Sequence, residues 1–343
     1  MVSWGNRARV GPVCPRGRHC HLVPEAALAW RPRTEQSSAK GAAQTKETGQ
    51  KSRVERLTQS HSVFHVKHAA YWCSSSSPSH IKGVILDLDG TLYRDNLPIP
   101  GAPESIEELR AQGYSVVFVT NAVESPTEHA AKLAALNIAA DADDIVTAST
   151  VLLRQLSLYL PHATLFPICD PPLLKALQPT YRISEDPDLI DVVIASCDLS
   201  FSYHKLNVGF QALRRGARFW ATNIDATWPI GEGEVPDAGA VIGALEACSR
   251  RKVELVAGKP SALVTETVLA RLALPARQCV IVGDRLETDI VMGHQAGMRT
   301  ALVLTGVTQR KELIHAPVQP DHVLESIVEV PLMLAGLASP SED

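Results

Sequence analysis

From residue 81 onward, short runs of consecutive apolar residues, many of them β-branched, alternate with amphipathic stretches. Several runs are apolar at every position, which is typical of strands buried on both faces of a parallel sheet. The predicted strands are Val84–Leu88, Val116–Thr120, Asp191–Ala195, Ala217–Thr222, Val253–Ala257, Val280–Gly283 and Thr300–Leu304. The predicted helices are Ala102–Gln112, Pro126–Leu136, Tyr203–Arg214, Ala262–Leu272 and Thr288–Ala296. This alternation predicts an α/β fold with a doubly wound (Rossmann-like) parallel sheet.

Residues 1–80 lack this pattern. They mix Arg, Gly, Ser, Gln and His with few periodic apolar positions, so we expect a disordered basic tail. The tail carries 12 Lys and Arg against 4 Glu. A second interpretation is that these residues are not part of the native protein. The commonest DNA back-translation of residues 64–67 equals its own reverse complement and resembles a bacterial chromosome-partition site. On this interpretation, the tail is upstream DNA translated from a wrong start codon.

The rest of the chain is acidic, with 21 Lys and Arg against 33 Asp and Glu. An acidic body argues against a nucleic-acid-binding face, and no apolar run approaches the roughly 18 residues that a membrane span needs. Seven cysteines, an odd number without regular spacing, indicate reduced thiols. We therefore expect a cytoplasmic protein whose partner is a small molecule rather than nucleic acid or a membrane.

The first motif with chemical content is Asp-Leu-Asp-Gly-Thr at residues 87–91, directly after a predicted strand. Alternation along the strand end turns Asp87 and Asp89 to the same side, where a ligand crevice is expected. Two adjacent carboxylates repel each other unless a cation or a shared proton relieves the charge, and a hard divalent cation such as Mg²⁺ would do so. Gly90 then lets backbone N–H groups approach an anion closely.

Three further elements follow at the ends of later strands. Thr120 and Asn121 offer a hydroxyl and an amide that can donate to phosphate oxygens. Lys259 opens a predicted helix and can neutralise a phosphate. Asp284 can bind a metal directly, and Asp289 can hold it through water or orient Lys259. Taken singly, Lys259 is by default a solvated lysine and Asp289 a helix cap.

In this order, the four elements resemble the haloacid dehalogenase superfamily of phosphohydrolases over residues 82–310. The resemblance implies that Asp87 is the nucleophile that forms an aspartyl phosphate, and that Asp89 is the general acid and base. It implies that Thr120 and Lys259 hold the phosphate. The implied ligands of Mg²⁺ are Asp87, the backbone carbonyl of Asp89, and Asp284, with Asp289 in support. Because the two roles need different environments, we expect Asp89 to be protonated more easily than Asp87.

About 140 residues separate the second element from the third, too many for a simple crossover between strands. We expect an inserted α/β cap domain at residues 147–248 within a core of residues 81–146 and 249–336. The insertion point and residues 221–225 look like the NagD-like subfamily, which includes nitrophenyl phosphatases and phosphatases of phosphoglycolate, glycerol phosphate and nucleotides.

The subfamily resemblance also implies which residues select the substrate. Asn223, Asp225 and the segment Trp228–Gly239 are candidates, and a homodimer formed through the cap is one expected assembly. Three acidic residues of the segment, Glu232, Glu234 and Asp237, disfavour highly charged substrates.

These observations predict a Mg²⁺-dependent phosphomonoesterase that hydrolyses a small organic phosphate. One alternative is a phosphotransferase or mutase that passes the phosphoryl group of the same intermediate to an alcohol. Another is a non-catalytic protein that binds a phosphorylated ligand. The pairing of Asp87 with Asp89 argues against the second, because a binding site gains little from a nucleophile next to an acid.

Overall fold

The computed structural model describes residues 80–229, 233–316 and 318–338, so the expected tail lies outside the described residues except for His80. The larger of two parallel sheets has six strands, in the spatial order β15-β14-β13-β1-β4-β5. The strands are β1 (Gly83–Asp87), β4 (Ser115–Thr120), β5 (Ile145–Thr147), β13 (Cys279–Gly283), β14 (Arg299–Val303) and β15 (His322–Leu324). The predicted doubly wound parallel sheet is confirmed.

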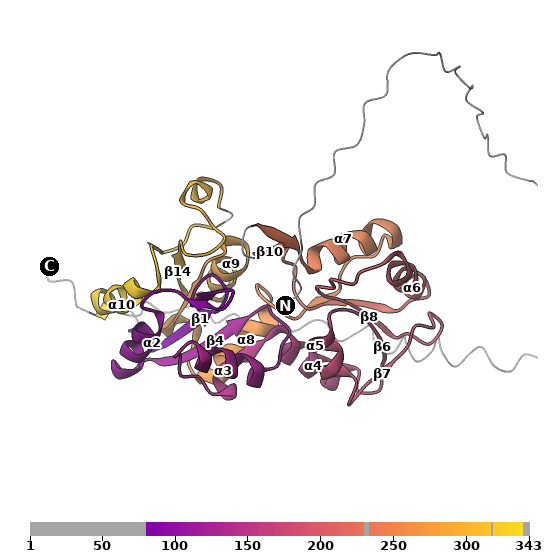
Figure 1. Ribbon diagram of the computed structural model, residues 1–343, viewed down its shortest axis with the longest axis horizontal. Helices are drawn as coiled ribbons and strands as arrows, with labels where there is room; N and C mark the ends of the chain where they lie inside the picture. Colours follow the sequence, from indigo (N-terminus) through magenta and orange to yellow (C-terminus); the bar gives the residue numbers. More distant parts are fainter. Residues whose placement is uncertain (1–79, 230–232, 317, 339–343) are drawn as a thin grey trace, which may run out of the picture. The chain divides into compact units, whose positions relative to one another are not determined.

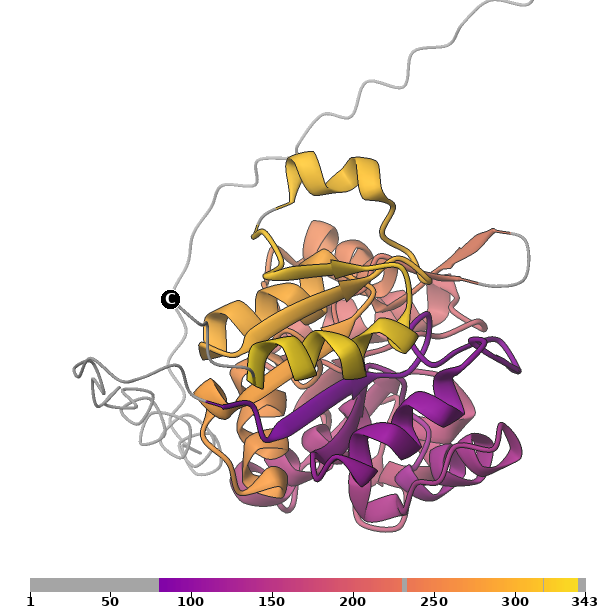
Figure 2. The ribbon, with the colours of Figure 1, turned by 90° about the vertical axis from the view of Figure 1, so that its left-hand side faces the viewer.

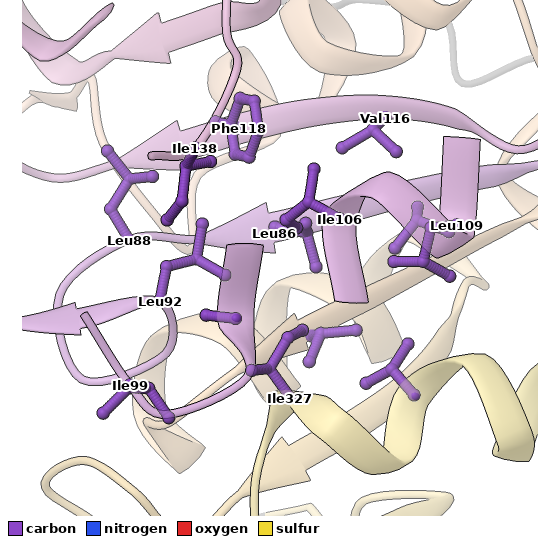
Figure 3. Close-up of a cluster of buried hydrophobic side chains, with 14 of the residues drawn as sticks. Leu86, Leu88, Leu92, Ile99, Ile106, Leu109, Val116, Phe118, Ile138 and Ile327 are labelled. Carbon is purple, nitrogen blue, oxygen red and sulfur yellow. The ribbon is translucent and has the colours of Figure 1, made fainter. Parts of the chain in front are cut away.

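Helices cover both faces of this sheet because its strands are apolar at nearly every position. One face packs against α2 (Ala102–Ala111), α3 (Pro126–Ala135) and α10 (Val330–Ala338). Figure 3 shows this cluster, with Leu86 of β1 and Phe118 of β4 beside Ile106 of α2. In Figure 2, α2 and α10 run alongside each other over that face. The opposite face packs against α4 (Ala148–Tyr159), α8 (Ala262–Leu272) and α9 (Val291–Ala296).

A second parallel sheet has the strand order β12-β9-β8-β6-β7. Its strands are β6 (Thr164–Ile168), β7 (Arg182–Ile183), β8 (Val192–Ala195), β9 (Arg218–Ala221) and β12 (Leu255–Val256). In Figure 1, α6 (Tyr203–Arg214) and α7 (Ala238–Ser249) lie along one face of it. The other face packs against α4 and α5 (Pro171–Leu177).

Two small hairpins complete the described fold. The first joins β2 (Tyr93–Arg94) to β3 (Leu97–Pro98), directly after the Asp-Leu-Asp-Gly-Thr motif. The second joins β10 (Thr227–Pro229) to β11 (Glu234–Pro236). None of the helices in the described ranges is long and apolar enough to cross a membrane.

Several local features differ from the expectations, and strands β5, β7 and β15 were not predicted. Strand β6 was not predicted either, because it contains Pro167, which has no N–H to donate. The neighbouring strand β7 pairs only with Thr164 and Leu165 of β6, so the proline interrupts no pairing between β6 and β7. The expected helix at Thr288–Ala296 begins with a π-helical turn, Leu286–Ile290, before α9. The second sheet extends to Val256, beyond the expected cap boundary at residue 248, because β12 pairs with β9.

Candidate active site

The predicted site residues meet at the carboxyl edge of the six-stranded sheet. β4 and β13 are the parallel neighbours of β1 on either side, so the ends of all three strands reach this edge. Asp87 ends β1, Thr120 ends β4, and Asp284 directly follows β13. Lys259 comes from the turn before α8, which packs against β4 and so brings the lysine to the same place.

Three buried carboxylates form the centre of the site. Asp87, Asp284 and Asp289 each offer an oxygen, and these oxygens lie within 4.8 Å of one another. None of the three residues is more than 5% exposed. The hydroxyl of Thr91 donates to Asp87 at 3.2 Å, and the backbone N–H of Val307 donates to Asp284 at 2.6 Å. An all-oxygen, anionic donor set of this kind fits a hard divalent cation such as Mg²⁺.

Lys259 is itself buried and is inserted between two of these carboxylates. Its ammonium donates to Oδ1 of Asp87 and, at 2.8 Å, to Oδ1 of Asp289. Burial alone would lower the pKa of Lys259, but the carboxylates of Asp289 and Asp87 raise it above its usual value. The lysine is therefore a fixed positive charge, and it is not the solvated residue that its local sequence predicts by default.

Burial raises the pKa of three carboxyl groups at the site, those of Asp284, Asp87 and Asp89. It raises the pKa of Asp284 to about 6, with a further contribution from the negative charge of Asp289. It raises the pKa of Asp87 well above its usual value, against the lowering effect of Lys259. Desolvation also raises the pKa of Asp89, which Lys132 and the Tyr93 hydroxyl partly oppose.

The expectation that Asp89 is protonated more easily than Asp87 stays a prediction, because the pKa values of both carboxyl groups are raised. Asp87 is surrounded by other acids that disfavour its ionised form, whereas Asp89 lies outside the carboxylate cluster. A divalent cation held by the cluster would lower the pKa of Asp87 and leave Asp89 as the more basic carboxylate.

Gly90 occupies a position that admits no side chain. Its φ is +82°, and a Cβ atom built there would lie 2.5 Å from the Asp284 carboxylate. Its N–H donates to the carbonyl of Tyr93 at 2.8 Å. The N–H of Gly90 is thus already used, and its contribution to the site is the close approach of the backbone to Asp284.

Thr120 and Asn121 have different surroundings. The Thr120 hydroxyl accepts from the N–H of Ala122 at 3.1 Å and keeps its own proton to donate. The Asn121 side chain is engaged at both ends. Its Oδ1 accepts from the N–H of Lys259 at 2.7 Å, and its Nδ2 donates to Asp225 at 2.8 Å. Asn121 therefore holds the lysine turn in place.

The predicted cap residues Asn223 and Asp225 belong to the same hydrogen-bond network. Asn223 donates to the carbonyl of Asn121 at 3.3 Å. Arg285, next to Asp284, donates to the carbonyl of Thr227 at 3.1 Å, and its guanidinium lies 3.9 Å from the Asp225 carboxylate. These contacts connect the segment after β9 to the carboxyl edge of the larger sheet.

A cavity of about 560 Å³ opens from this centre, a size suited to a small ligand. Trp228, which is 36% exposed, lines it together with Asp225 and Asp237. Asp87, Asp89, Lys259 and Asp284 also line it. The remaining acidic and basic lining residues are Glu124, Glu128, His129, Lys132, Asp170 and Arg285.

Sequence reasoning missed two residues that line this cavity and a third, Tyr93, that contacts the lining residue Asp89. Tyr93 donates from its hydroxyl to Asp89, and Lys132 and His129 face the cavity from α3. His129 is 5% exposed, and its Nε2 lies 3.8 Å from the Glu124 carboxylate, too far for a hydrogen bond. The available signal for Tyr93 was its position four residues after Asp89. For α3, the signal was a His and a Lys three positions apart, which places them on one helix face.

Comparisons with known proteins agree with this geometry. Residues 84–180 match the family model of haloacid dehalogenase-like hydrolases, and residues 256–330 match a second, HAD-hydrolase-like model. Sugar-phosphatase AraL of Bacillus subtilis is 36% identical over 75% of this chain and 94% of its own. The structure of a 4-nitrophenylphosphatase from Thermotoga maritima is 33% identical and covers 74% of this chain and 97% of its own, with a TM-score of 0.69. NagD from E. coli K-12 is 29% identical over 73% of this chain and 98% of its own, with a TM-score of 0.65.

Proposed function

The chain belongs to the NagD-like haloacid dehalogenase-like hydrolases, and from this premise we propose that it is a Mg²⁺-dependent phosphomonoesterase whose substrate is the phosphate ester of a small, uncharged organic group. The observation that carries the proposal is the meeting of a buried three-carboxylate cluster, a buried lysine and the half-exposed Asp89 at one cavity. Phosphatases are among its relatives by name, including a sugar phosphatase.

Asp87 is the proposed nucleophile. Its carboxylate oxygen forms a bond to phosphorus while the bond from phosphorus to the ester oxygen breaks, which gives an aspartyl phosphate. Lys259 and the Thr120 hydroxyl balance the negative charge of the phosphoryl oxygens. Asp87, Asp284 and the carbonyl of Asp89 would hold the cation, with Asp289 in support. When bound, the cation screens the repulsion between carboxylate and phosphate.

Asp89 is the proposed general acid and base. It first gives its proton to the leaving ester oxygen, which departs as an alcohol. As a carboxylate it then takes a proton from water, whose oxygen attacks phosphorus and breaks the bond to Asp87. The products are inorganic phosphate and the free nucleophile, so protons balance over the two steps. Its side chain, 48% exposed beside the cavity, can reach both the leaving group and the water.

The charges around the cavity favour a leaving group without charge. Away from the carboxylate centre, Lys132 lies near Asp89, and Arg285 lies near Asp225. Further acidic side chains at Glu124, Glu128, Asp170 and Asp237 also line the cavity. An anionic leaving group would meet net negative charge there, whereas the hydroxyls of a sugar or polyol can donate to carboxylates. We also expect a cytoplasmic location, in keeping with the free thiols of Cys169, Cys197, Cys248 and Cys279.

The test is release of inorganic phosphate from matched esters with Mg²⁺ and with EDTA. The panel contains sugar phosphates, glycerol phosphate, 4-nitrophenyl phosphate, nucleoside monophosphates and phosphoglycolate. We expect Mg²⁺-dependent release that Asp87→Asn abolishes and that Asp95→Asn, an exposed carboxylate in the β2–β3 hairpin, leaves unchanged. Absence of release across the panel would refute the phosphatase proposal. A higher kcat/KM for phosphoglycolate than for the sugar phosphates would refute the argument from charge.

A further inference from the structure

We propose that Tyr93 and Lys132 are positioning residues that hold the Asp89 carboxylate on the leaving-group side of the cavity, apart from the three-carboxylate centre. The proposal rests on the proposed phosphatase function and assigns to two further residues the placement of its acid and base. The two residues lie in different elements, β2 and α3, and both reach the same carboxylate.

Tyr93, Lys132 and Asp89 form a closed triangle of contacts. The Tyr93 hydroxyl donates to Oδ2 of Asp89 at 3.1 Å. The Lys132 ammonium lies 4.0 Å from Oδ1 of the same carboxylate. The ammonium also lies 3.8 Å from the centre of the Tyr93 ring, a cation–π contact. Each oxygen of Asp89 thus has its own partner, so rotation of the carboxylate would lose both contacts.

Tyr93 is a fixed point within this triangle. It is fully buried, and it belongs to the same hydrophobic cluster as Leu88 and Leu92, which Figure 3 labels. Backbone contacts hold it close to the motif, because the N–H of Gly90 donates to its carbonyl and Asp89 forms an isolated bridge with it. The hydroxyl is therefore placed by the core, independently of any ligand.

Lys132 is held by the geometry of α3. The helix begins with a capping box in which Ser125 and Glu128 exchange hydrogen bonds, and Leu133 is buried in the core. This fixes the rotation of the helix and turns residue 132 toward the cavity. Contact with the tyrosine ring removes part of the freedom of the lysine side chain, which is 33% exposed.

A positioning role has a physical reason. Asp89 is two residues from Asp87, and its carboxylate is half-exposed, so it could turn toward a cation or the ammonium of Lys259 at the centre. In the described structure its oxygens do not belong to the metal-binding cluster. The tyrosine and lysine hold it where a leaving oxygen must be protonated. An acid displaced by about 1 Å can lose about 100-fold in rate.

The experiment compares Tyr93→Phe, Lys132→Met and Lys132→Arg with the parent on two esters. The leaving group of glycerol phosphate is a strongly basic alkoxide unless it is protonated. The leaving group of 4-nitrophenyl phosphate is a weakly basic phenolate that needs no proton. For Tyr93→Phe we expect kcat on glycerol phosphate to fall about 10- to 100-fold, with KM nearly unchanged. First-turnover release of 4-nitrophenolate should change less than 3-fold. Lys132→Met should lose less than Tyr93→Phe, and Lys132→Arg should recover most of that loss.

A double-mutant cycle separates positioning from a general loss of structure. In the Asp89→Asn background, assayed with enzyme in excess, Tyr93→Phe should change the residual rate less than 2-fold, because the group through which it acts is absent. Tyr181→Phe is the matched control, since this tyrosine is also buried but its hydroxyl has no hydrogen-bond partner among the described residues. It should match the parent in activity and in melting temperature.

The outcomes distinguish the two proposals. If the parent hydrolyses no ester of the panel, the proposed function fails, and the positioning role fails with it. If it hydrolyses another alkyl ester of the panel instead of glycerol phosphate, that ester takes the place of glycerol phosphate in the comparison. If the parent hydrolyses both, equal losses for Tyr93→Phe on the two esters refute the positioning role alone. The positioning role is also refuted if Tyr93→Phe lowers the rate as much in the Asp89→Asn background as in the parent, or if it does not lower the rate of the parent at all.

Discussion

Replacing Lys259 with methionine removes the ammonium that separates the buried carboxylates of Asp87 and Asp289. Methionine is close to lysine in length and fills the space of its aliphatic chain, so the main change is the loss of charge. We expect the variant to be strongly destabilised without a divalent cation and to regain much of that stability with Mg²⁺. The reason is that either cation can offset the same negative charges.

The magnitude follows from burial. The side chains of Lys259, Asp87 and Asp289 are 4%, 7% and 0% exposed, so water cannot replace the lost partner. Removing one member of a buried ion pair costs about 3–5 kcal/mol. At about 2–4 °C per kcal/mol for a domain of this size class, the melting temperature in EDTA should fall by roughly 6–20 °C. Mg²⁺ at 100 times its dissociation constant would return about 2.7 kcal/mol.

The assay is thermal unfolding followed by circular dichroism, in EDTA and across a MgCl₂ titration. The shift caused by Mg²⁺ should be larger for Lys259→Met than for the parent, because the cluster without the ammonium attracts the cation more strongly. Lys252→Met is the control, since its 84% exposed ammonium pairs with Glu246 at the surface and such pairs contribute about 0–1 kcal/mol. Equal melting temperatures of Lys259→Met and the parent in EDTA would refute the reasoning.

Two further predictions concern residues around the site. In Gly258→Ala, the new Cβ would lie 2.7 Å from the carbonyl of Thr222 and closer still to Asn121, so the turn carrying Lys259 must move. Phosphate release by Gly258→Ala should therefore fall about 10- to 100-fold. Gly243→Ala is the control, because its new Cβ would meet nothing within 4 Å, and it should not lower the activity. Equal activities of the two variants would contradict the steric argument. Burial raises the pKa of Asp237 to about 6, so the folded state keeps a proton that the unfolded state loses near pH 4. Stability should therefore fall by about 2 kcal/mol between pH 4 and pH 6, and urea unfolding of Asp237→Asn should lack this part of the slope. Identical slopes for the variant and the parent would exclude this contribution.

Much of the core could be predicted because its signals are local. Each central strand is a short apolar run, and its proposed site residue stands at or just after its last residue, so finding the strand also locates Asp87, Thr120 or Asp284. Parallel pairing then brings these strand ends to one edge whatever the rest of the chain does. Strands β5, β7 and β15 escaped prediction, and each has only two or three residues. Strand β6 and the start of the helix after Arg285 escaped it too, because Pro167 and a π-helical turn depart from the local pattern.

The sequence by itself therefore determined the parallel sheet, the acidic motif and the sheet edge at which the proposed site residues meet. Tertiary structure alone decided which polar groups remain free. Asn121 looks like a phosphate ligand in sequence, but the turn at Lys259, 138 residues away, uses both ends of its amide. Asp89 acquires its partners only because helix α3 turns Lys132 toward the buried ring of Tyr93. Such contacts depend on how elements distant in sequence pack against each other, and local periodicity carries no record of that packing.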